Sequence, residues 1–239
     1  MNIALLLSGG TGTRLGAEIP KQYLKAKDKM IITYCLETLF ASAKVDVVWV
    51  VADSNWQDDI ILELKKFGLK HSKLKGFSLP GANRQMSIYN GLTDVMKLAS
   101  EGSAVMIHDA ARPLLTEELI NRCFDSLGCH DGVMPVLPMK DTVYMSSDGK
   151  SVSELLDRQS IFAGQAPEVF DLYRYYQACY ELLPDKIMMI NGSTEPAILA
   201  GMNIAMVPGD EGNFKITTKE DLNRFLDIID KQEMKIDKL

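Results

Sequence analysis

Short apolar runs alternate with amphipathic segments along most of this 239-residue chain. The apolar runs predict buried strands over residues 3–7, 45–53, 103–113 and 131–139. Apolar residues at helical spacing predict helices over residues 31–42, 55–68, 84–99 and 218–232, and from Thr116 onward. Strands that alternate with helices form a mainly parallel sheet with helices on both faces, so the expected fold class is α/β.

Size and composition limit what such a fold can do. With 46% hydrophobic residues the chain can bury one substantial core, so we expect a single domain over residues 1–239. The net charge of -6 argues against a nucleic-acid binder, which needs a basic surface. The first apolar run is too short to span a bilayer, and the N-terminus lacks the basic region and cleavage site of a secretory signal. We therefore expect a cytoplasmic protein with no membrane partner.

Residues 140–162 interrupt the alternation of strands and helices. Two short β-like runs flank the sequence Ser146-Ser147-Asp148-Gly149, and Asp-Gly is a usual pair for a tight hairpin turn. We therefore expect a β-arm at approximately residues 138–162 that projects from the main sheet.

The first predicted strand runs into a glycine-rich segment, SGGTGTRLGAEIPK (residues 8–21). Glycines let backbone N–H groups approach an anion closely, while Arg14 and Lys21 supply positive charge and Pro20 stiffens the approach to Lys21. The segment is not a Walker loop, because no Gly-Lys-Ser/Thr follows the glycines. Leu15 stands where the dinucleotide fingerprint needs a glycine. A phosphate-binding loop is preferred over a surface turn with solvated charges.

A second polar motif, HDAARP (residues 108–113), follows a predicted buried strand. Asp109 would lie at the carboxyl edge of the sheet, where ligands of open α/β folds bind. A carboxylate there can hold Mg²⁺, which in turn holds nucleotide phosphates. A turn or cap role for Asp109 and a surface ion pair for Arg112 are the alternatives. For His108, a half-buried, hydrogen-bonded imidazole is preferred over a catalytic one.

Two further signals are weak by themselves. Gly81, Arg84 and Ser87 surround a predicted helix start, where backbone N–H groups favour polar or anionic ligands. Lys215 is expected in a short strand before the last helix, where an edge-strand lysine is the ordinary interpretation. Both signals gain weight only in the company of the other motifs.

Together, these motifs resemble those of the CTP-dependent cytidylyltransferases that act on polyol phosphates. The resemblance covers almost the whole chain, in the order GGTGTRLG, PKQYL, GANRQMSIYNGL, HDAARP, the KDT…LDR arm, GQAPEVF and NFKITTKEDL. One branch of that family acts on 2-C-methyl-D-erythritol 4-phosphate and the other on ribitol 5-phosphate. The resemblance implies a Rossmann-like nucleotidyltransferase fold, a homodimer with interlocked arms, CTP as co-substrate, and Mg²⁺ or another divalent cation.

The same resemblance implies roles for individual residues. It implies that the triphosphate lies along Ser8, Gly9, Gly10, Thr11, Gly12, Thr13 and Arg14. It implies nucleotide contacts from Gly81, Ala82, Arg84, Ser87 and Ala110. Asp109 would hold Mg²⁺ near the α-phosphate and contact the substrate, and the catalytic cations would be Arg14, Lys21 and Lys215. The acceptor phosphate would meet Lys215, Arg112 and, from the arm of a partner subunit, Thr142 and Arg158.

These roles suit the chemistry of cytidylyl transfer. An acceptor phosphate oxygen attacks the α-phosphorus of CTP, and pyrophosphate leaves. Because a phosphate monoester is already mostly anionic at neutral pH, no side-chain nucleophile or strong general base is required. Positioning and electrostatic stabilisation of charge should carry nearly all of the catalysis.

The chain departs from the family pattern where the polyol binds. Relatives usually carry Thr-Asp ten residues before the glycine at Gly201, whereas this chain reads NGSTEP over residues 191–196. Gln165 in GQAPE is closer to the ribitol branch, which tends to read GQTPQ, while the spacing of Arg14 and Lys21 is closer to the methylerythritol branch. We favour D-ribitol 5-phosphate as acceptor, with 2-C-methyl-D-erythritol 4-phosphate as the alternative.

Two other classes stay open. A nucleotidyltransferase for another base or acceptor, such as a sugar-1-phosphate enzyme, also uses a glycine-rich loop, an arginine and a lysine. A degenerate nucleotide-binding scaffold without turnover would explain the altered residues 191–196, but not the charged residues retained around the expected triphosphate.

Overall fold

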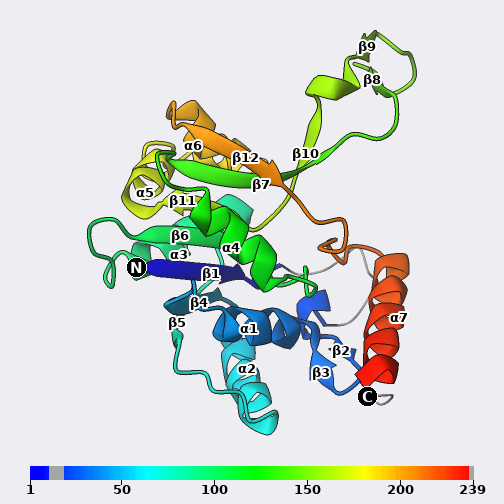
Figure 1. The fold of residues 1–239 in the computed structure, drawn as a ribbon. Helices are drawn as coiled ribbons and strands as arrows, with labels where there is room; N and C mark the ends of the chain where they lie inside the picture. Colours follow the sequence, from blue (N-terminus) through cyan, green and yellow to red (C-terminus); the bar gives the residue numbers. More distant parts are fainter. Residues whose placement is uncertain (11–18, 237–239) are drawn as a thin grey trace.

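The structure is a computed structural model that describes residues 1–10 and 19–236 (Figure 1). Its centre is an eight-stranded sheet in the order β10-β7-β11-β6-β1-β4-β5, with β12 beside β7. The strands of this sheet are β1 (Asn2–Leu7), β4 (Val47–Val51), β5 (Leu74–Ser78), β6 (Ala104–Asp109), β7 (Gly132–Pro138), β10 (Phe162–Gly164), β11 (Glu168–Asp171) and β12 (Ile204–Pro208). A separate small pair consists of β2 (Lys25–Ala26) and β3 (Lys29–Met30).

Helices cover both faces of the sheet (Figure 1). The α-helices are α1 (Ile31–Ala41), α2 (Ser54–Lys66), α3 (Arg84–Val95), α4 (Glu117–Asp125), α5 (Leu172–Tyr180), α6 (Glu195–Leu199) and α7 (Lys219–Ile236). The 3-10 helices are η2 (Lys21–Tyr23), η3 (Arg158–Ser160) and η4 (Lys186–Met189). Alternate residues of β1 enter two apolar cores, because successive side chains of a strand point to opposite faces. Ala4 and Leu6 pack in the core with α1, α2 and α4, whereas Ile3 and Leu5 pack in the core with α3 and α5.

The centre of the sheet is parallel, as the sequence predicts. β1 is parallel to both β4 and β6, and β4 is parallel to β5. β11 is antiparallel to β6 and β7, and β10 is antiparallel to β7, so the sheet is mixed at the other side. Leu7 pairs with both Val51 and Asp109, which places the carboxyl ends of three central strands at one edge. Ligands of open α/β sheets bind outside such an edge, where the strand order reverses.

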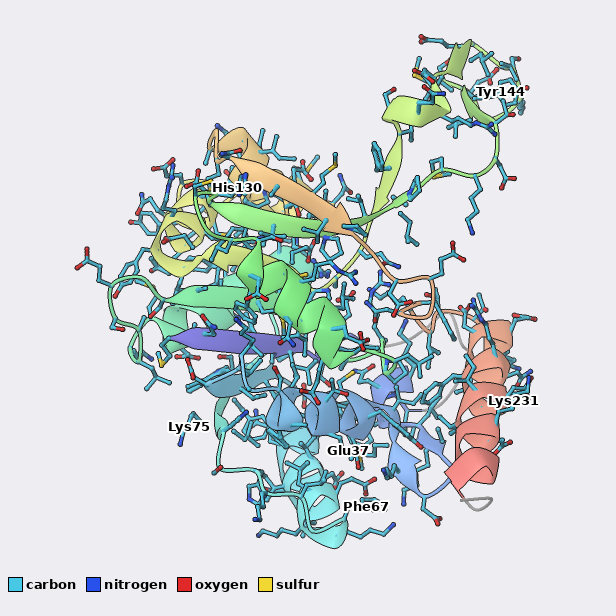
Figure 2. All side chains as sticks on the ribbon, in the orientation of Figure 1. Glu37, Phe67, Lys75, His130, Tyr144 and Lys231 are labelled. Atoms are coloured by element: carbon cyan, nitrogen blue, oxygen red, sulfur yellow. The ribbon has the colours of Figure 1, made fainter. Side chains whose placement is uncertain are left out.

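The predicted β-arm is confirmed. β8 (Val143–Met145) pairs with β9 (Glu154–Leu156) in an antiparallel hairpin that projects from the body of the protein, as the position of Tyr144 in Figure 2 also shows. In the turn, Asp148 Oδ1 accepts hydrogen bonds from the N–H groups of Lys150 and Ser151, both at 2.8 Å. Tyr144 is 57% exposed and Leu155 is 62% exposed, so the arm offers apolar surface to solvent or to another chain.

The short strand predicted around Lys215 is wrong. Residues 214–217 belong to no sheet, and the N–H of Ile216 donates to the carbonyl of Ala111 at 2.8 Å. The segment is thus tied to the turn after β6 rather than to a strand. The predicted start of the last helix is confirmed, since Thr218 Oγ1 accepts from the N–H of Asp221 and Asp221 Oδ2 accepts from the N–H of Thr218. None of the helices in the described part of the chain combines the length and the apolarity that crossing a bilayer requires.

Candidate active site

A cavity of about 400 Å³ lies at the carboxyl edge of β1 and β6. Its walls come from distant parts of the chain: the ends of both strands, the start of α3, η2 and the segment before α7. Of the residues singled out from the sequence, the cavity brings together Gly9, Gly10, Lys21, Gly81, Ala82, Arg84, Ser87, Asp109 and Lys215. This convergence makes the cavity the candidate active site.

Asp109 is the centre of a charge cluster in this cavity. Its Oδ1 accepts a hydrogen bond from Arg84 Nε at 3.2 Å, and its Oδ2 accepts one from Lys215 Nζ at 2.9 Å. Arg112 Nε lies 3.7 Å from the same Oδ2. One carboxylate therefore faces three cations, so the cluster carries a net positive charge.

Burial disfavours the charged forms of Asp109 and Arg84, but the attraction between opposite charges in the cluster outweighs this effect. Burial by itself would raise the pKa of Asp109, yet Arg84, Lys215 and Arg112 hold it well below its usual range. Burial likewise opposes the charge of Arg84, whereas Asp109 and Glu168 raise its pKa. Asp109 is thus a carboxylate and Arg84 a cation across the range in which proteins function.

His108 takes no part in the cavity. It is completely buried, rather than half-buried as expected, and its Nε2 lies 3.2 Å from the carbonyl oxygen of Arg112. Burial lowers the pKa of His108 to about 4, so the imidazole is neutral at pH 7. The preference for a structural histidine over a catalytic one agrees with this environment.

The start of α3 is shaped by two side chains and one glycine. Asn83 caps the helix, since its Oδ1 accepts from the N–H of Met86 at 2.7 Å. Ser87 Oγ accepts from the N–H of Gly81 at 2.9 Å and donates to the carbonyl of Asn83 at 2.8 Å. A Cβ at Gly81 would lie 2.4 Å from that of Met86, so only glycine fits this approach. Ser87 consequently fixes the loop before the helix, and Arg84 at the start of the helix reaches Asp109.

Gly9, Gly10 and two residues of η2, Lys21 and Gln22, form another part of the cavity wall. Gly9 packs so closely against Pro80 that a Cβ at Gly9 would lie 2.4 Å from the Pro80 Cβ. Gln22 donates from Nε2 to the carbonyls of Ser8 and Gly10, and its neighbour Lys21 lines the cavity. Thr11, Gly12, Thr13 and Arg14, which the sequence also singled out, lie outside the described residues.

The other predicted site residues do not line the cavity. Ser8 and Ala110 are buried beside it, and the N–H of Ala110 donates to Leu7 O at 2.9 Å. Arg112 reaches the cluster through Asp109 and also donates from Nη1 to Asn213 O at 2.8 Å. Thr142 and Arg158 lie on the arm, where they line a separate hollow. A single protomer does not bring these two residues to Asp109.

Several residues at the site had no assigned role in the sequence. Asn83, Ala111, Thr217 and Gln22 line the cavity, and Glu168 is buried next to the charge cluster. PKQYL and GQAPE contain Gln22 and Glu168, but nothing in a linear motif distinguishes a buried polar side chain from an exposed one. The useful signal would have been a polar residue inside an apolar stretch, as for Glu168 before Val169 and Phe170.

The donor set limits the kind of metal that the cavity could hold. The described residues contain no group of three His, Cys, Asp or Glu side chains that could hold an ion. Asp109 is the one carboxylate among the described lining residues. Mg²⁺ usually binds one or two carboxylates together with substrate phosphates. Asp109 is therefore suited to bind a Mg²⁺ ion whose other ligands come from nucleotide phosphates. One carboxylate does not supply enough ligands for a metal held by protein side chains alone.

Comparison with a protein family decides the class of the site. A family model described as IspD, 2-C-methyl-D-erythritol 4-phosphate cytidylyltransferase, matches residues 2–230. The chain belongs to this family. As a member of the IspD family it is a cytidylyltransferase, an enzyme of the nucleotidyltransferase class, and the resemblance read from its motifs is confirmed.

Relatives of this IspD-family chain include enzymes named for two different acceptors. It is 32% identical to a "Ribitol-5-phosphate cytidylyltransferase" from Streptococcus agalactiae serotype Ia, over 98% of this chain and 97% of the relative. It is 30% identical to a "2-C-methyl-D-erythritol 4-phosphate cytidylyltransferase" from Thermosipho melanesiensis, over 93% and 95%. A solved 4-diphosphocytidyl-2C-methyl-D-erythritol synthase from Anaerococcus prevotii has a TM-score of 0.81 at 22% identity, with 96% of each chain covered. That likeness confirms the expected nucleotidyltransferase fold.

Proposed function

We propose that this enzyme transfers the cytidylyl group of CTP to a polyol phosphate in a Mg²⁺-dependent reaction that releases a CDP-polyol and pyrophosphate. The observation that carries the proposal is the cluster at the cavity, in which Asp109 is bonded to Arg84 and Lys215 and lies beside Arg112. A positively charged cavity that retains one carboxylate suits two anionic substrates and a nucleotide-bound metal.

In this proposal the nucleotide occupies the cavity. The triphosphate lies along residues 8–14, and the base contacts Gly81, Ala82 and Ser87, near Ala110. Asp109 would ligate Mg²⁺ near the α-phosphate. When bound, that ion would neutralise charge on the triphosphate, as in other phosphoryl-transfer sites.

The chain's own cations do the remaining work. Lys215 and Arg112 hold the acceptor phosphate, so that one of its oxygens faces the α-phosphorus. That oxygen forms the new P–O bond, the bond from the α-phosphorus to the bridging oxygen breaks, and pyrophosphate leaves with the electron pair. Arg14 and Lys21 stabilise the charge that develops on the leaving group. The attack needs no proton transfer, which agrees with the absence of a cavity-lining histidine among the described residues.

For the acceptor we favour D-ribitol 5-phosphate. Relatives named for ribitol 5-phosphate match this chain at 32% identity over 98% of its length. The alternative, 2-C-methyl-D-erythritol 4-phosphate, is supported by relatives of 30% and 32% identity over 93% of the chain. The two sets are close in identity, so the acceptor has to be decided by experiment.

We also propose that the enzyme acts as a homodimer. The exposed arm would reach the partner and bring the partner's Thr142 and Arg158 to the acceptor phosphate. Support comes from the apolar side chains on the hairpin, which have no partner surface within the described part of this protomer.

An acceptor panel tests the proposed function. Pyrophosphate release from CTP and Mg²⁺ is measured with ribitol 5-phosphate, 2-C-methyl-D-erythritol 4-phosphate and several sugar 1-phosphates. We expect release with ribitol 5-phosphate, and none without an acceptor. Thermal stabilisation by CTP, UTP, GTP and ATP is compared in parallel. Preference for a purine would overturn the cytidylyl assignment, and CTP binding without turnover of any acceptor would favour a degenerate scaffold.

A further inference from the structure

Gln22 holds two carbonyl groups of the glycine-rich segment. Its Nε2 donates to the carbonyl oxygen of Ser8 at 2.6 Å and to that of Gly10 at 2.8 Å. A side-chain amide has two donor hydrogens, and both are used here. Gln22 is only 3% exposed, so water does not compete for these bonds.

Tyr23 holds one of the same carbonyls. Its hydroxyl donates to the carbonyl oxygen of Ser8 at 3.0 Å and accepts from Ser8 Oγ at 2.8 Å. The Tyr23 ring is stacked on Trp56 of α2, with centroids 4.2 Å apart. The Ser8 carbonyl thus accepts two bonds from η2, the same short helix that carries Lys21 into the cavity wall.

The direction of a carbonyl decides the direction of the next N–H. In a planar trans peptide, the C=O of one residue and the N–H of the following residue point in opposite directions. Since the carbonyl of Ser8 points toward Gln22, the N–H of Gly9 points away from it. Among residues 1–10 and 19–236, no acceptor bonds the N–H of Gly9 or of Gly10, and both glycines line the cavity.

We propose that Gln22 is a positioning residue for the triphosphate of CTP. By holding the carbonyls of Ser8 and Gly10 against η2, it keeps these oxygens from facing the anion and leaves N–H groups of the loop to bind it. A carbonyl oxygen turned into the cavity would repel a phosphate, whereas a backbone N–H binds one. The inference rests on the proposed function, because it requires the triphosphate to bind beside Gly9 and Gly10.

Equilibrium binding without an acceptor tests this role. The dissociation constants of CTP and of inorganic tripolyphosphate, each with Mg²⁺, are measured by calorimetry for the wild type, Gln22→Met and Gln22→Glu. Gln22→Met removes both donors at similar size. We expect it to weaken both ligands about tenfold, the effect of one or two lost hydrogen bonds. Gln22→Glu also adds a negative charge beside the anion, so we expect a larger loss.

A matched variant separates positioning from a general loss of stability. Gln57 also donates from Nε2 to a backbone carbonyl, that of Ala52 at 3.0 Å, but it does not line the cavity. Gln57→Met should lower the thermal midpoint, because it removes one such bond, and change the affinity for CTP less than about twofold. If Gln22→Met fails to fold, Tyr23→Phe decides, since it removes one donor to Ser8 O and keeps the ring. We expect it to weaken tripolyphosphate about threefold.

The outcomes distinguish this inference from the proposed function. Equal affinity of wild type and Gln22→Met for tripolyphosphate would overturn the role of Gln22, even if cytidylyl transfer is observed. Weaker CTP binding with unchanged tripolyphosphate binding would also overturn it, because the effect would then arise at the base. Loss of tripolyphosphate affinity in an enzyme that turns over no acceptor would support Gln22 and refute the proposed reaction. A wild type that binds neither ligand would overturn both.

Discussion

The hydroxyl group of Ser193 donates a hydrogen bond to Oε1 of the buried Glu168. Thr194 Oγ1 lies 3.4 Å from the same oxygen. Glu168 begins β11 and pairs with Ile107 of β6, two residues before Asp109. Residues 193 and 194 are therefore joined directly to the edge of the sheet that forms the candidate active site.

Glu168 should make the stability of the protein fall as pH rises. Burial raises its pKa more than Arg84 and Ser193 lower it, so the folded protein binds this proton more tightly than the unfolded chain. Above the ordinary pKa of about 4.5, stability is lost until the pH passes the raised value. Glu168→Gln should remove this loss, measured as the difference in unfolding free energy between variant and wild type in urea from pH 4 to pH 8. Glu181→Gln, at an exposed site after α5, is the control, and parallel curves for Glu168→Gln and wild type would contradict the prediction.

His108 should act on stability in the opposite direction. Its pKa is about 4 in the folded protein and about 6.5 when unfolded, so the unfolded chain binds more protons between these values. Stability should rise by about 3 kcal/mol as pH increases from 4 to 6.5, at 1.36 kcal/mol for each pH unit. His108→Gln keeps a donor near Arg112 O and should flatten that part of the curve. The same urea series measures it, and a wild type and variant with equal slopes would refute it.

Asp109→Asn should remove most of the activity. The change leaves Arg84, Arg112 and Lys215 without their shared carboxylate and removes the proposed ligand of Mg²⁺. We expect kcat/KM to fall by about 10²–10³, the usual effect of losing one group that stabilises transition-state charge. Asp94→Asn is the control, because Asp94 of α3 pairs with Lys97 just after the helix, outside the cavity lining. Retention of more than about a third of the activity by Asp109→Asn would exclude an essential role.

Lys215→Ala should mainly affect the acceptor step. Lys215 Nζ lies 2.9 Å from Asp109 Oδ2, and we propose that it holds the acceptor phosphate. We expect kcat/KM for the acceptor to fall by about 10²–10³, with a much smaller change in the dissociation constant of CTP. Lys97→Ala is the control, because Lys97 also pairs with an aspartate, Asp94 at 2.7 Å, but does so on the surface. The Lys215 assignment fails if both alanine variants have the same kinetics.

Mixing two inactive variants tests the interlocked dimer. If Arg158 acts in the partner's site, a dimer of one Arg158→Ala chain and one Lys215→Ala chain has one intact site and one doubly altered site. Random exchange makes half of the dimers mixed, so about a quarter of the wild-type activity should return. The rate of pyrophosphate release is measured before and after the two proteins are unfolded and refolded together. No recovery, with normal refolding of the wild type, would place Arg158 in its own protomer's site.

Features that depend on near neighbours could be predicted from the amino-acid sequence. Short apolar runs identify β1, β4 and β6, because these strands are buried on both faces, and apolar residues at helical spacing identify several helices. The Asp-Gly turn of the arm and the cap between Thr218 and Asp221 need only residues a few positions apart. Since the carboxyl ends of parallel strands share one edge, the sequence also placed Asp109 where the cavity lies.

Contacts between side chains far apart in the chain could not be predicted and follow from the folded structure. Lys215 reaches Asp109 across 106 positions because Ile216 is bonded to the turn after β6, and this contact replaces the strand that its local sequence suggested. Gln22 holds Ser8 and Gly10, and Ser193 binds Glu168, through bonds that leave no periodic trace in either segment. These contacts form when the core packs, because each buried polar group then needs a hydrogen-bond donor or acceptor nearby. Which partner is nearby depends on the whole fold.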